Sequence, residues 1–557
     1  MTRILLLLFM SITFFSCKKN SSGGNMPATF FVSFAVNGKN NGTKIYTGIN
    51  SNPVIELICT SQVSEPIVAS NVSLVDINNS PVSLSVTMQN NDSVAVIKPA
   101  TALNGFSSYT FSVSSGLTST HKAILLNPFS ITLTTAIDSS AKFPQIADTA
   151  LLTLVQQQTF KYFWDFGHPV CGLARERDNG DNDVVTTGGS GFGIMSMVVA
   201  VNRGFITRSD AVTRLNTIVN FLTAKCQRWH GAFSHWINGS TGATVPFGNN
   251  NGADIVETSY LLEGLLTARQ YFNSIFDANE TALRDSINSI WNTVEWNWFT
   301  QNAAASSIYW QYNPSYSSVS DIWSIPVSGW NEALITYVLS ASSTTYPITK
   351  GVYDSGWAKL GAITNGNSYY GITLPLGEAY GGPLFFSHYS FLGINPNNLS
   401  DAYCNNYFAQ NSAHAQINYD YCVANPQHNY GYSSLCWGLT ASDIPGGYTA
   451  SSPTNDVGVI APTAAVSSMP YTSTQSMDAI RFFYFTLGDK IWGNYGFADA
   501  FDLNNPWFAS SHLAIDEGPI ICMIENYRSG LLWNLFMSCP EIKSGMKKLG
   551  FSSPSLN

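Results

Sequence analysis

The stretch FGIMSMVVAV, residues 192–201, is apolar on nearly every side of a helix. A helix without a polar face must be buried on all sides. Two further stretches share this character: 334–339 and 519–524. The segments 208–225 and 280–298 are instead amphipathic, as expected of helices that cover a core. The alternation of outer amphipathic and inner apolar helices predicts an (α/α)6 barrel over residues 148–557.

Capping residues and apolar spacing predict roughly twelve helices in this region, the first capped by Asp148. They are expected to begin near Asp148, Gly189, Arg208, Asp254, Asn279, Trp330, Gly382, Ser400, Ala461, Thr474, Ile515 and Pro540. In an (α/α)6 barrel, the loops at the N-termini of the inner helices line a central cavity. Functional residues are therefore expected where the apolar helices begin.

Residues 29–138 have a different pattern, in which short apolar runs alternate with Ser and Thr. About seven such runs, separated by Asn, Gly and Pro clusters, predict an all-β immunoglobulin-like sandwich. The region contains no cluster of catalytic carboxylates or histidines. We expect it to act as a spacer or a sugar-binding accessory domain, joined to the helical part by a linker at 139–147.

The N-terminus predicts export. Residues 1–16 contain an apolar run that is too short to span a bilayer and ends at Phe14-Phe15-Ser16-Cys17. This resembles a bacterial lipoprotein signal, with Cys17 as the lipidated residue and 17–28 as a flexible linker. The alternative is an ordinary secretory signal. The expected location is the periplasm or outer membrane of a Gram-negative bacterium, with the lipid anchor as the only membrane attachment.

Composition limits the class of ligand. Charged residues make up 11% of the 557 residues, against roughly 25% in an average soluble protein, and the net charge is -9. No basic stripe is present, so nucleic acid is a poor candidate partner. A surface rich in amide, hydroxyl and aromatic side chains suits a neutral polyhydroxylated ligand.

The cysteines show no metal-binding spacing, and the sequence leaves open whether Cys422 and Cys436 form a disulfide.

Several buried-looking helices open with acidic residues. Asp254 and Glu257 are three apart at the start of one helix and share a face. Mutual repulsion and burial raise the pKa of such carboxyl groups, while the helix dipole opposes the rise. Asp254 is predicted to cap the helix and to contact the substrate, which leaves Glu257 as the functional acid. Glu332 and Asp516 repeat this arrangement, and Asp443 lies in a loop where it acts as a base or as a turn residue.

Polar and aromatic side chains are the candidates for sugar contacts. Asp181 and Asp183 are predicted to bind hydroxyl groups or, as the weaker alternative, a cation. The aromatic and histidine rings are predicted either to stack on pyranose faces or to belong to the core. These residues are His230, His235, Trp236, Trp310, Trp330, Tyr389 and Trp437. His230 and His235 are five apart, which does not fit a zinc-binding helix pair, so no metal site is expected.

Long strings of residues carry a resemblance to a known family. Among them are TGGSGFGIM (187–195), NGADIVETSYLLEGLLTARQYF (251–272), WGLTASD (437–443) and LAIDEGPIICMIENYRSGLLW (513–533). The helical part resembles the glucoamylase-like domain of bacterial β-1,2-glucanases, glycoside hydrolase family 144; the β domain does not take part. The resemblance implies an (α/α)6 barrel that hydrolyses linear β-1,2-glucan with inversion and without a cofactor. It places the general acid on Glu257 and the general base on Asp443.

Three functions remain open at this point: an endo-acting β-1,2-glucanase, an exo-acting enzyme that releases sophorose, and a non-catalytic glycan-binding lipoprotein. One departure concerns the substrate contacts. Tyr309-Trp310-Gln311-Tyr312 stands where the family leads us to expect a Trp-His-Trp-like string. A different subsite, or a different preference for chain length, is the expected consequence.

Overall fold

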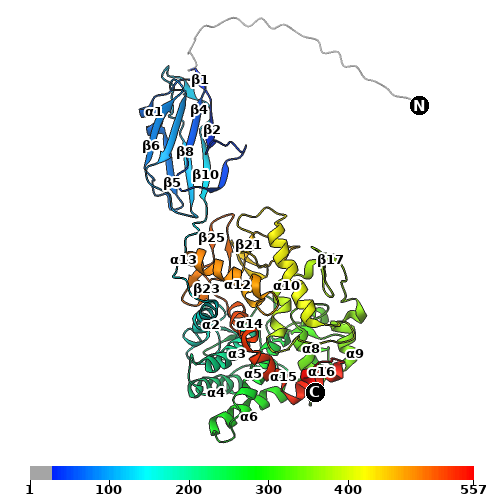
Figure 1. The fold of residues 1–557 in the computed structure, drawn as a ribbon. Coiled ribbons are helices and arrows are strands. Elements are labelled where there is room, and N and C mark those ends of the chain that lie inside the picture. Colours follow the sequence, from blue (N-terminus) through cyan, green and yellow to red (C-terminus); the bar gives the residue numbers. More distant parts are fainter. Residues whose placement is uncertain (1–27) are drawn as a thin grey trace, which may run out of the picture. The chain divides into compact units, whose positions relative to one another are not determined.

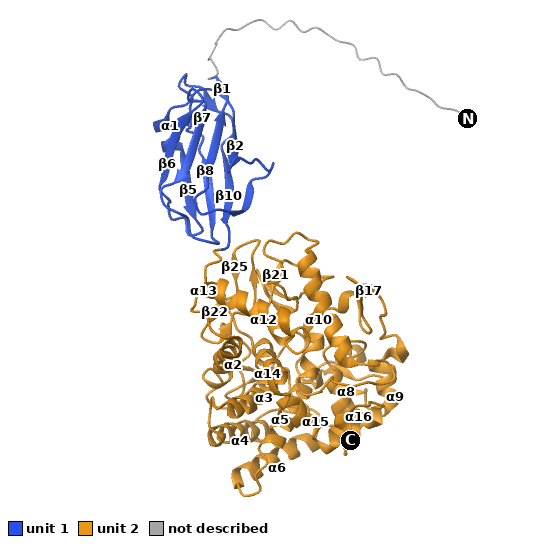
Figure 2. Cartoon of the chain, viewed as in Figure 1, with its two compact units in different colours: residues 1–137 blue, residues 138–557 orange. Residues whose placement is uncertain are grey.

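The computed structural model describes residues 28–557, and the chain divides into two compact units, one up to Ile137 and the other from Asp138 (Figure 2). The predicted signal peptide, residues 1–16, and the predicted lipidation site Cys17 lie outside the described residues. Each unit has a hydrophobic core of its own.

The first unit is built from two four-stranded sheets with the strand orders β3-β10-β8-β5 and β2-β4-β7-β6, and β1 pairs with β9. Its elements are β1 (Thr29–Phe30), β2 (Val32–Val36), β3 (Ile45–Ile49), β4 (Ile55–Cys59), α1 (Glu65–Asn71), β5 (Val72–Asp76), β6 (Leu84–Gln89), β7 (Val94–Pro99), β8 (Ser108–Val113), β9 (Ile124–Leu125) and β10 (Phe129–Thr135). Alternate residues from both sheets, such as Leu57, Ile97 and Phe111, fill one core.

The second unit is rich in helices (Figure 1). They are α2 (Asp148–Trp164), α3 (Thr187–Arg203), α4 (Arg208–Ala224), α5 (Ile255–Tyr271), α6 (Ala278–Asn292), α7 (Val319–Ile322), α8 (Leu334–Ser342), α9 (Lys350–Val352), α10 (Tyr407–Ala424), α11 (Pro462–Ser467), α12 (Ser473–Arg481), α13 (Gly488–Ile491), α14 (Ala514–Ser529), α15 (Leu531–Met537) and α16 (Pro540–Leu549). Most begin close to the predicted starts. The exceptions are the region after Gly382, which forms 3-10 turns, and α10, which begins seven residues after Ser400.

One capping prediction was wrong. Ala147, not Asp148, is the N-cap of α2, and the carboxylate of Asp148 forms an ion pair with Arg481 instead. The ion pair with a distant arginine is a tertiary contact, which local sequence cannot reveal. Asp148 still contributes a negative charge to the first turn of α2, where the helix dipole favours it.

Three apolar helices, α3, α5 and α14, form the interior of this unit, with α3 packed against both of the others (Figure 1). The α3–α5 crossing is very close because each helix presents a glycine. A Cβ on Gly191 would lie 2.1 Å from the carbonyl oxygen of Tyr260, and a Cβ on Gly264 would lie 2.1 Å from that of Gly191. Two of the three segments predicted to be buried on all sides, 192–201 and 519–524, lie in α3 and α14, and the third, 334–339, lies in α8, whose residues are all buried.

An all-α description is wrong in one respect, because the helical unit also contains many short strands in small sheets. They are β11 (Val184–Thr186), β12 (Trp236–Asn238), β13 (Thr244–Val245), β14 (Ala253–Asp254), β15 (Tyr309–Tyr312), β16 (Trp323–Pro326), β17 (Ser368–Tyr369), β18 (Ile372–Thr373), β19 (Ala441–Ile444), β20 (Gly447–Ala450), β21 (Val459–Ile460), β22 (Trp492–Gly493), β23 (Gly496–Phe497), β24 (Phe501–Asp502) and β25 (Trp507–Phe508). β11 leads into α3 and β14 into α5. Pairing satisfies buried backbone groups where these helices begin, and two or three residues are too few to show a strand period.

No described cysteine is in a disulfide: Cys422 and Cys436 are both free thiols and both buried. Burial raises the pKa of the Cys422 thiol and, more strongly, that of Cys436. None of the helices between residues 28 and 557 has the length and hydropathy needed to cross a membrane.

Glu263 gives a prediction about stability. It is fully buried in α5, where its Oε1 accepts a hydrogen bond of 2.7 Å from the Gly393 amide, and burial raises its pKa well above the ordinary value. The stabilising effect of the neutral form is complete below the pKa of an unfolded glutamate and is lost as the pH rises toward the folded pKa. Above the pKa of an unfolded glutamate, the free energy of unfolding of the wild type should therefore fall with rising pH. The difference in free energy of unfolding between Glu263→Gln and the wild type should grow in favour of Glu263→Gln by up to about 1.4 kcal/mol per pH unit. Thermal unfolding of both proteins, measured from acidic to neutral pH, checks this prediction. If the stabilities of the two proteins change with pH in parallel, the prediction is wrong.

Candidate active site

The helical unit contains a cavity of about 480 Å³ where several inner helices begin. Its lining combines acids with aromatic side chains: Glu176, Arg177, Thr186, His235, Trp236, Phe247, Glu257, Trp310, Glu332, Phe385, Tyr389, Ala441, Tyr448, Ala450, Leu513 and Ile515. A cavity with apolar walls and a few convergent acids is typical of a site that binds and cleaves a neutral ligand.

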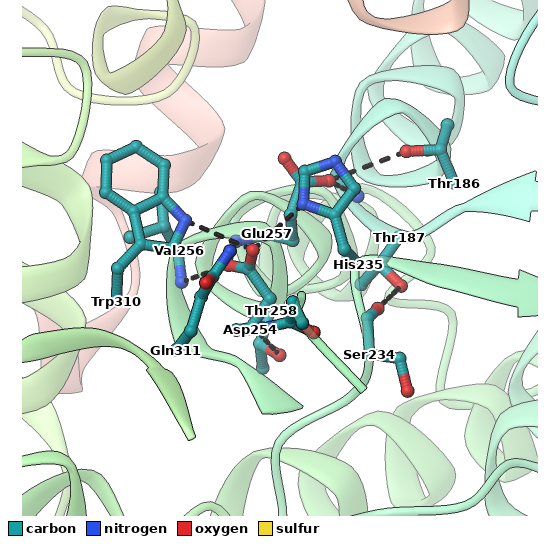
Figure 3. Close-up of polar contacts among 12 residues, drawn as sticks. Thr186, Thr187, Ser234, His235, Asp254, Val256, Glu257, Thr258, Trp310 and Gln311 are labelled. Atoms are coloured by element: carbon teal, nitrogen blue, oxygen red, sulfur yellow. Dashed lines mark hydrogen bonds and ion pairs between the residues drawn. The ribbon is translucent and has the colours of Figure 1, made fainter. Parts of the chain in front are cut away.

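Glu257 lies in the first turn of α5 and points into this cavity (Figure 3). Asp254 caps the helix as predicted, because its Oδ1 accepts from the amides of Val256 and Glu257. The Gly188 amide donates a 2.7 Å hydrogen bond to Glu257 Oε2. Position 188 must be glycine, since a Cβ there would lie 2.5 Å from that oxygen. The TGGSGFG segment thus holds one carboxyl group in place.

The surroundings of Glu257 favour its protonated form. Only 6% of the residue is exposed, and burial raises its pKa. The neighbouring Asp254 charge acts in the same direction, whereas His235 and the Gly188 amide lower the pKa without cancelling the rise. A carboxyl group that stays protonated toward neutral pH is the group that a general acid requires.

Asp254 is a structural partner of this acid. Its Oδ2 accepts from His235 Nδ1 at 2.9 Å and from the Trp310 indole at 3.1 Å (Figure 3). Burial lowers the pKa of His235, but the charges of Glu257 and Asp254 outweigh this and raise it to about 9. Asp254 is 0% exposed and does not line the cavity, so its predicted contact with substrate is wrong. It instead orients two residues that do line it.

Asp443 lies on β19, where it is paired with Tyr448 of β20. Its carboxylate accepts from Arg177 at 3.1 and 3.2 Å and from the Ser511 hydroxyl at 2.5 Å. Arg177 and Tyr448 line the cavity, while Asp443 itself is held beside them and is half-buried. The residue is therefore part of a short hairpin, and its negative charge is matched by a guanidinium at the cavity wall.

Two further acids line the cavity. Burial raises the pKa of Glu332 to about 7, and the charges of Glu257 and Asp254 add to the rise. Glu176 is paired with Arg177 at 2.9 Å, so one arginine joins Glu176 to Asp443. Glu332 was predicted from its place before an apolar helix. Glu176 was not singled out, although the charged run 175–178 is unusual in so uncharged a chain.

Comparison with known proteins decides the family. The Glycoamylase model, which describes a glucoamylase family, matches residues 324–540. The structure of an endo-β-1,2-glucanase from Chitinophaga pinensis is 46% identical with a TM-score of 0.71, and the match covers 74% of this chain and 100% of that chain. The chain belongs to the bacterial β-1,2-glucanases of glycoside hydrolase family 144.

Two more members of the β-1,2-glucanase family come from Parabacteroides distasonis. An exo β-1,2-glucooligosaccharide sophorohydrolase is 44% identical over 434 residues, which are 74% of this chain and 59% of that protein. This chain therefore spans about three fifths of that relative's length. The structure of a β-1,2-glucanase is 36% identical with a TM-score of 0.70, and the match covers 94% of this chain and 73% of that one.

The predicted aromatic contacts of this β-1,2-glucanase family member divide into two groups. Trp236, Trp310, Tyr389 and His235 line the cavity. His235 also stacks on Phe247 with ring centroids 3.9 Å apart. Three lining aromatics were not predicted: Phe247, Phe385 and Tyr448. All three stand close to glycines in the sequence (Gly248, Gly381-Gly382 and Gly446-Gly447). Glycines also mark ordinary turns, so this pattern gave no reason to single out the aromatic residues.

Other predicted contacts lie in the core or elsewhere on the surface. Trp437 is 0% exposed and donates to the Gln475 carbonyl, and Trp330 packs among Trp357, Phe391 and Tyr407. Neither tryptophan lines the cavity, so the prediction that they stack on sugar is wrong. A tryptophan in the core and one in a subsite look alike in sequence.

The polar residues outside the cavity have structural partners. His230 stacks on Trp298 and pairs with Glu295, and Asp183 pairs with His168. Asp181 accepts from the amide of Asp183 in a surface turn, and Asp516 is buried at the start of α14. None of these four lines the cavity. Among residues 28–557, no group of three or more His, Cys, Asp or Glu side chains is arranged to hold a metal ion.

Proposed function

We propose that this protein hydrolyses linear β-1,2-glucan as an endo-acting, inverting enzyme, with Glu257 as the general acid and Asp443 as the general base. The observation that carries the proposal is the buried Glu257 carboxyl group, which has a raised pKa and points into an aromatic-lined cavity. The proposal also rests on the Chitinophaga pinensis endo-β-1,2-glucanase, whose whole length this chain matches.

In this mechanism Glu257 gives its proton to the glycosidic oxygen as the bond between that oxygen and the anomeric carbon breaks. Water attacks the anomeric carbon from the opposite face, and Asp443 takes the proton that the water loses, directly or through a substrate hydroxyl. Arg177 pairs with the Asp443 carboxylate and holds it beside the cavity wall. The flat faces of Trp236, Trp310 and Tyr389 provide stacking surfaces for glucose rings.

The finer architecture belongs to the same proposal. We assign the helical unit to an (α/α)6 barrel, with α3, α5 and α14 among its inner helices, and the first unit to an immunoglobulin-like accessory domain. We also propose that the protein is exported and anchored through a lipid on Cys17, as its first seventeen residues suggest. Metabolic labelling with a radioactive fatty acid tests the anchor, since Cys17→Ser should abolish the label.

An exo-acting sophorohydrolase is the second candidate. It is favoured by the exo β-1,2-glucooligosaccharide sophorohydrolase of Parabacteroides distasonis, which is 44% identical over 434 residues. Linear β-1,2-glucan distinguishes the two actions. The proposed endo action predicts a rapid fall in viscosity with a mixture of oligosaccharides, whereas sophorose as the sole early product would establish exo action. Binding without new reducing ends would establish a glycan-binding protein, and Glu257→Gln protein serves as the matched control.

A further inference from the structure

Three buried carboxyl groups that the proposed mechanism does not use adjoin the base. Asp499, Asp516 and Glu517 are each at most 3% exposed. Asp499 Oδ1, Asp516 Oδ2 and Glu517 Oε2 receive no hydrogen bond from any residue between 28 and 557. Because a buried carboxylate without a donor is costly, at least part of this group must hold protons.

Asp499 is tied to the base by a closed ring of hydrogen bonds. The amide of Asp443 donates to Asp499 Oδ2 at 2.7 Å. The amide of Asp499 donates to the Ser511 carbonyl at 2.9 Å, and the Ser511 hydroxyl donates to Asp443 Oδ2. Residues 499 and 511 therefore hold both the backbone and the carboxylate of Asp443. The bond from the Asp443 amide is strongest when Asp499 is an anion.

The carboxyl groups of Asp499 and Asp516 lie within hydrogen-bonding reach of each other, so a single proton can bridge the pair. Burial raises the pKa of Asp499 to about 7 and also raises the pKa of Asp516. The charged and titratable groups that face this pair are Asp443, Arg177, Glu517, Tyr389 and Tyr448. Asp516 is the better holder of the proton, because the Asp443 amide stabilises an anion on Asp499 whereas Asp516 Oδ2 has no donor among residues 28–557.

We propose that Asp499 is a positioning residue for the base: it holds the Asp443 backbone as an anion, while Asp516 carries the proton that the two share. The inference rests on the proposed role of Asp443. A negative Asp499 and a positive Arg177 therefore contact Asp443 from two sides with opposite charges. The buried pair thus adjusts the base without touching substrate.

Two variants of nearly unchanged shape, Asp499→Asn and Asp516→Asn, distinguish the effect of the negative charge on residue 499 from the effect of its hydrogen bond to Asp443. In Asp516→Asn the amide still donates to Asp499, so the charge stays on residue 499. In Asp499→Asn the side-chain carbonyl still accepts from the Asp443 amide, but residue 499 no longer carries a negative charge. We expect Asp516→Asn to keep kcat and KM on β-1,2-glucan within about threefold of the wild type.

Asp499→Asn should lower kcat about tenfold with KM nearly unchanged. It should also move the acidic limb of the kcat/KM profile to lower pH by about one unit, because the negative charge next to the base is removed while the positive charge of Arg177 stays. Equal losses of kcat in both variants without a shift of the acidic limb would overturn the proposal, and so would a wild-type pH profile in Asp499→Asn.

If Asp499→Asn does not fold, the Asp499→Asn/Asp516→Asn double variant provides the same test. A shifted acidic limb supports the proposal and an unshifted limb overturns it.

Asp443→Asn, measured in the same series, separates this proposal from the proposed function. If Asp443→Asn keeps its activity, the role of Asp443 fails and the positioning role fails with it. If Asp443→Asn is inactive and the limb of Asp499→Asn does not move, only the positioning role fails.

Discussion

Glu257→Gln should lower kcat on linear β-1,2-glucan by about 10²–10⁴-fold while the substrate still binds. Glutamine has nearly the same size, and its side-chain carbonyl can accept the hydrogen bond that the Gly188 amide now gives to Glu257. The cavity should therefore keep its shape and lose only the proton that the leaving oxygen needs. Reducing-end assays measure the rate, and calorimetry with the same oligosaccharides measures binding.

A substrate with a better leaving group sharpens this test. An aryl β-glucoside of the β-1,2 series needs little protonation as it leaves, so Glu257→Gln should recover much of its rate on that substrate. Glu263→Gln is the matched control, since Glu263 is also buried in α5 but lies outside the cavity. If Glu257→Gln lowers kcat by less than tenfold, Glu257 is not the general acid. Glu332, the other cavity-lining carboxyl group with a raised pKa, would then be the candidate.

Asp443→Asn should cause a loss of the same order, about 10²–10⁴-fold. The asparagine can keep the hydrogen bond from Ser511 but cannot take a proton from water, and it leaves the Arg177 charge without one of its two partners. A better leaving group should not restore its rate, because the missing step is activation of water. This difference between the two variants assigns the two roles.

Glu176→Gln is the control for the loss at Asp443. It breaks the other ion pair of Arg177 and leaves Asp443 intact, so we expect activity within about tenfold of the wild type. If Glu176→Gln loses more activity than Asp443→Asn, the base is Glu176. Asp181 and Asp183 are poorer candidates for the base, because Asp181 lies in a surface turn and Asp183 bonds His168 and Ser240, whereas Asp443 is bound to the cavity-lining Arg177.

The features that could be predicted from the sequence are those determined by residues close to one another along the chain. The cap at Asp254, the place of Glu257 in the first turn of its helix and a helix start near Gly189 follow from spacing and residue type, and the structure has these elements. Contacts between distant segments could not be predicted. The partner of Asp443 is Arg177, 266 residues earlier in the chain, and nothing in either local sequence indicates the pair.

Side chains of one type proved hardest to divide between core and cavity. Both Trp310 and Trp437 were predicted to stack on sugar or to belong to the core, yet Trp310 lines the cavity and Trp437 is buried beside Tyr419. The difference arises because Trp310 is on β15, which pairs with β14 at the entry to α5, and Trp437 precedes the β19 strand. Strands this short leave no periodic pattern from which the direction of a side chain can be inferred.

Proton NMR during digestion of linear β-1,2-glucan tests the central claim that Glu257 and Asp443 act on opposite faces of one glycosidic bond. Spectra recorded before the anomers equilibrate identify the configuration of the new reducing ends. The proposed mechanism predicts that the α-anomer appears first, since each β-linkage is inverted in one displacement. New reducing ends that appear first as the β-anomer would contradict it, and so would a wild-type protein that releases none.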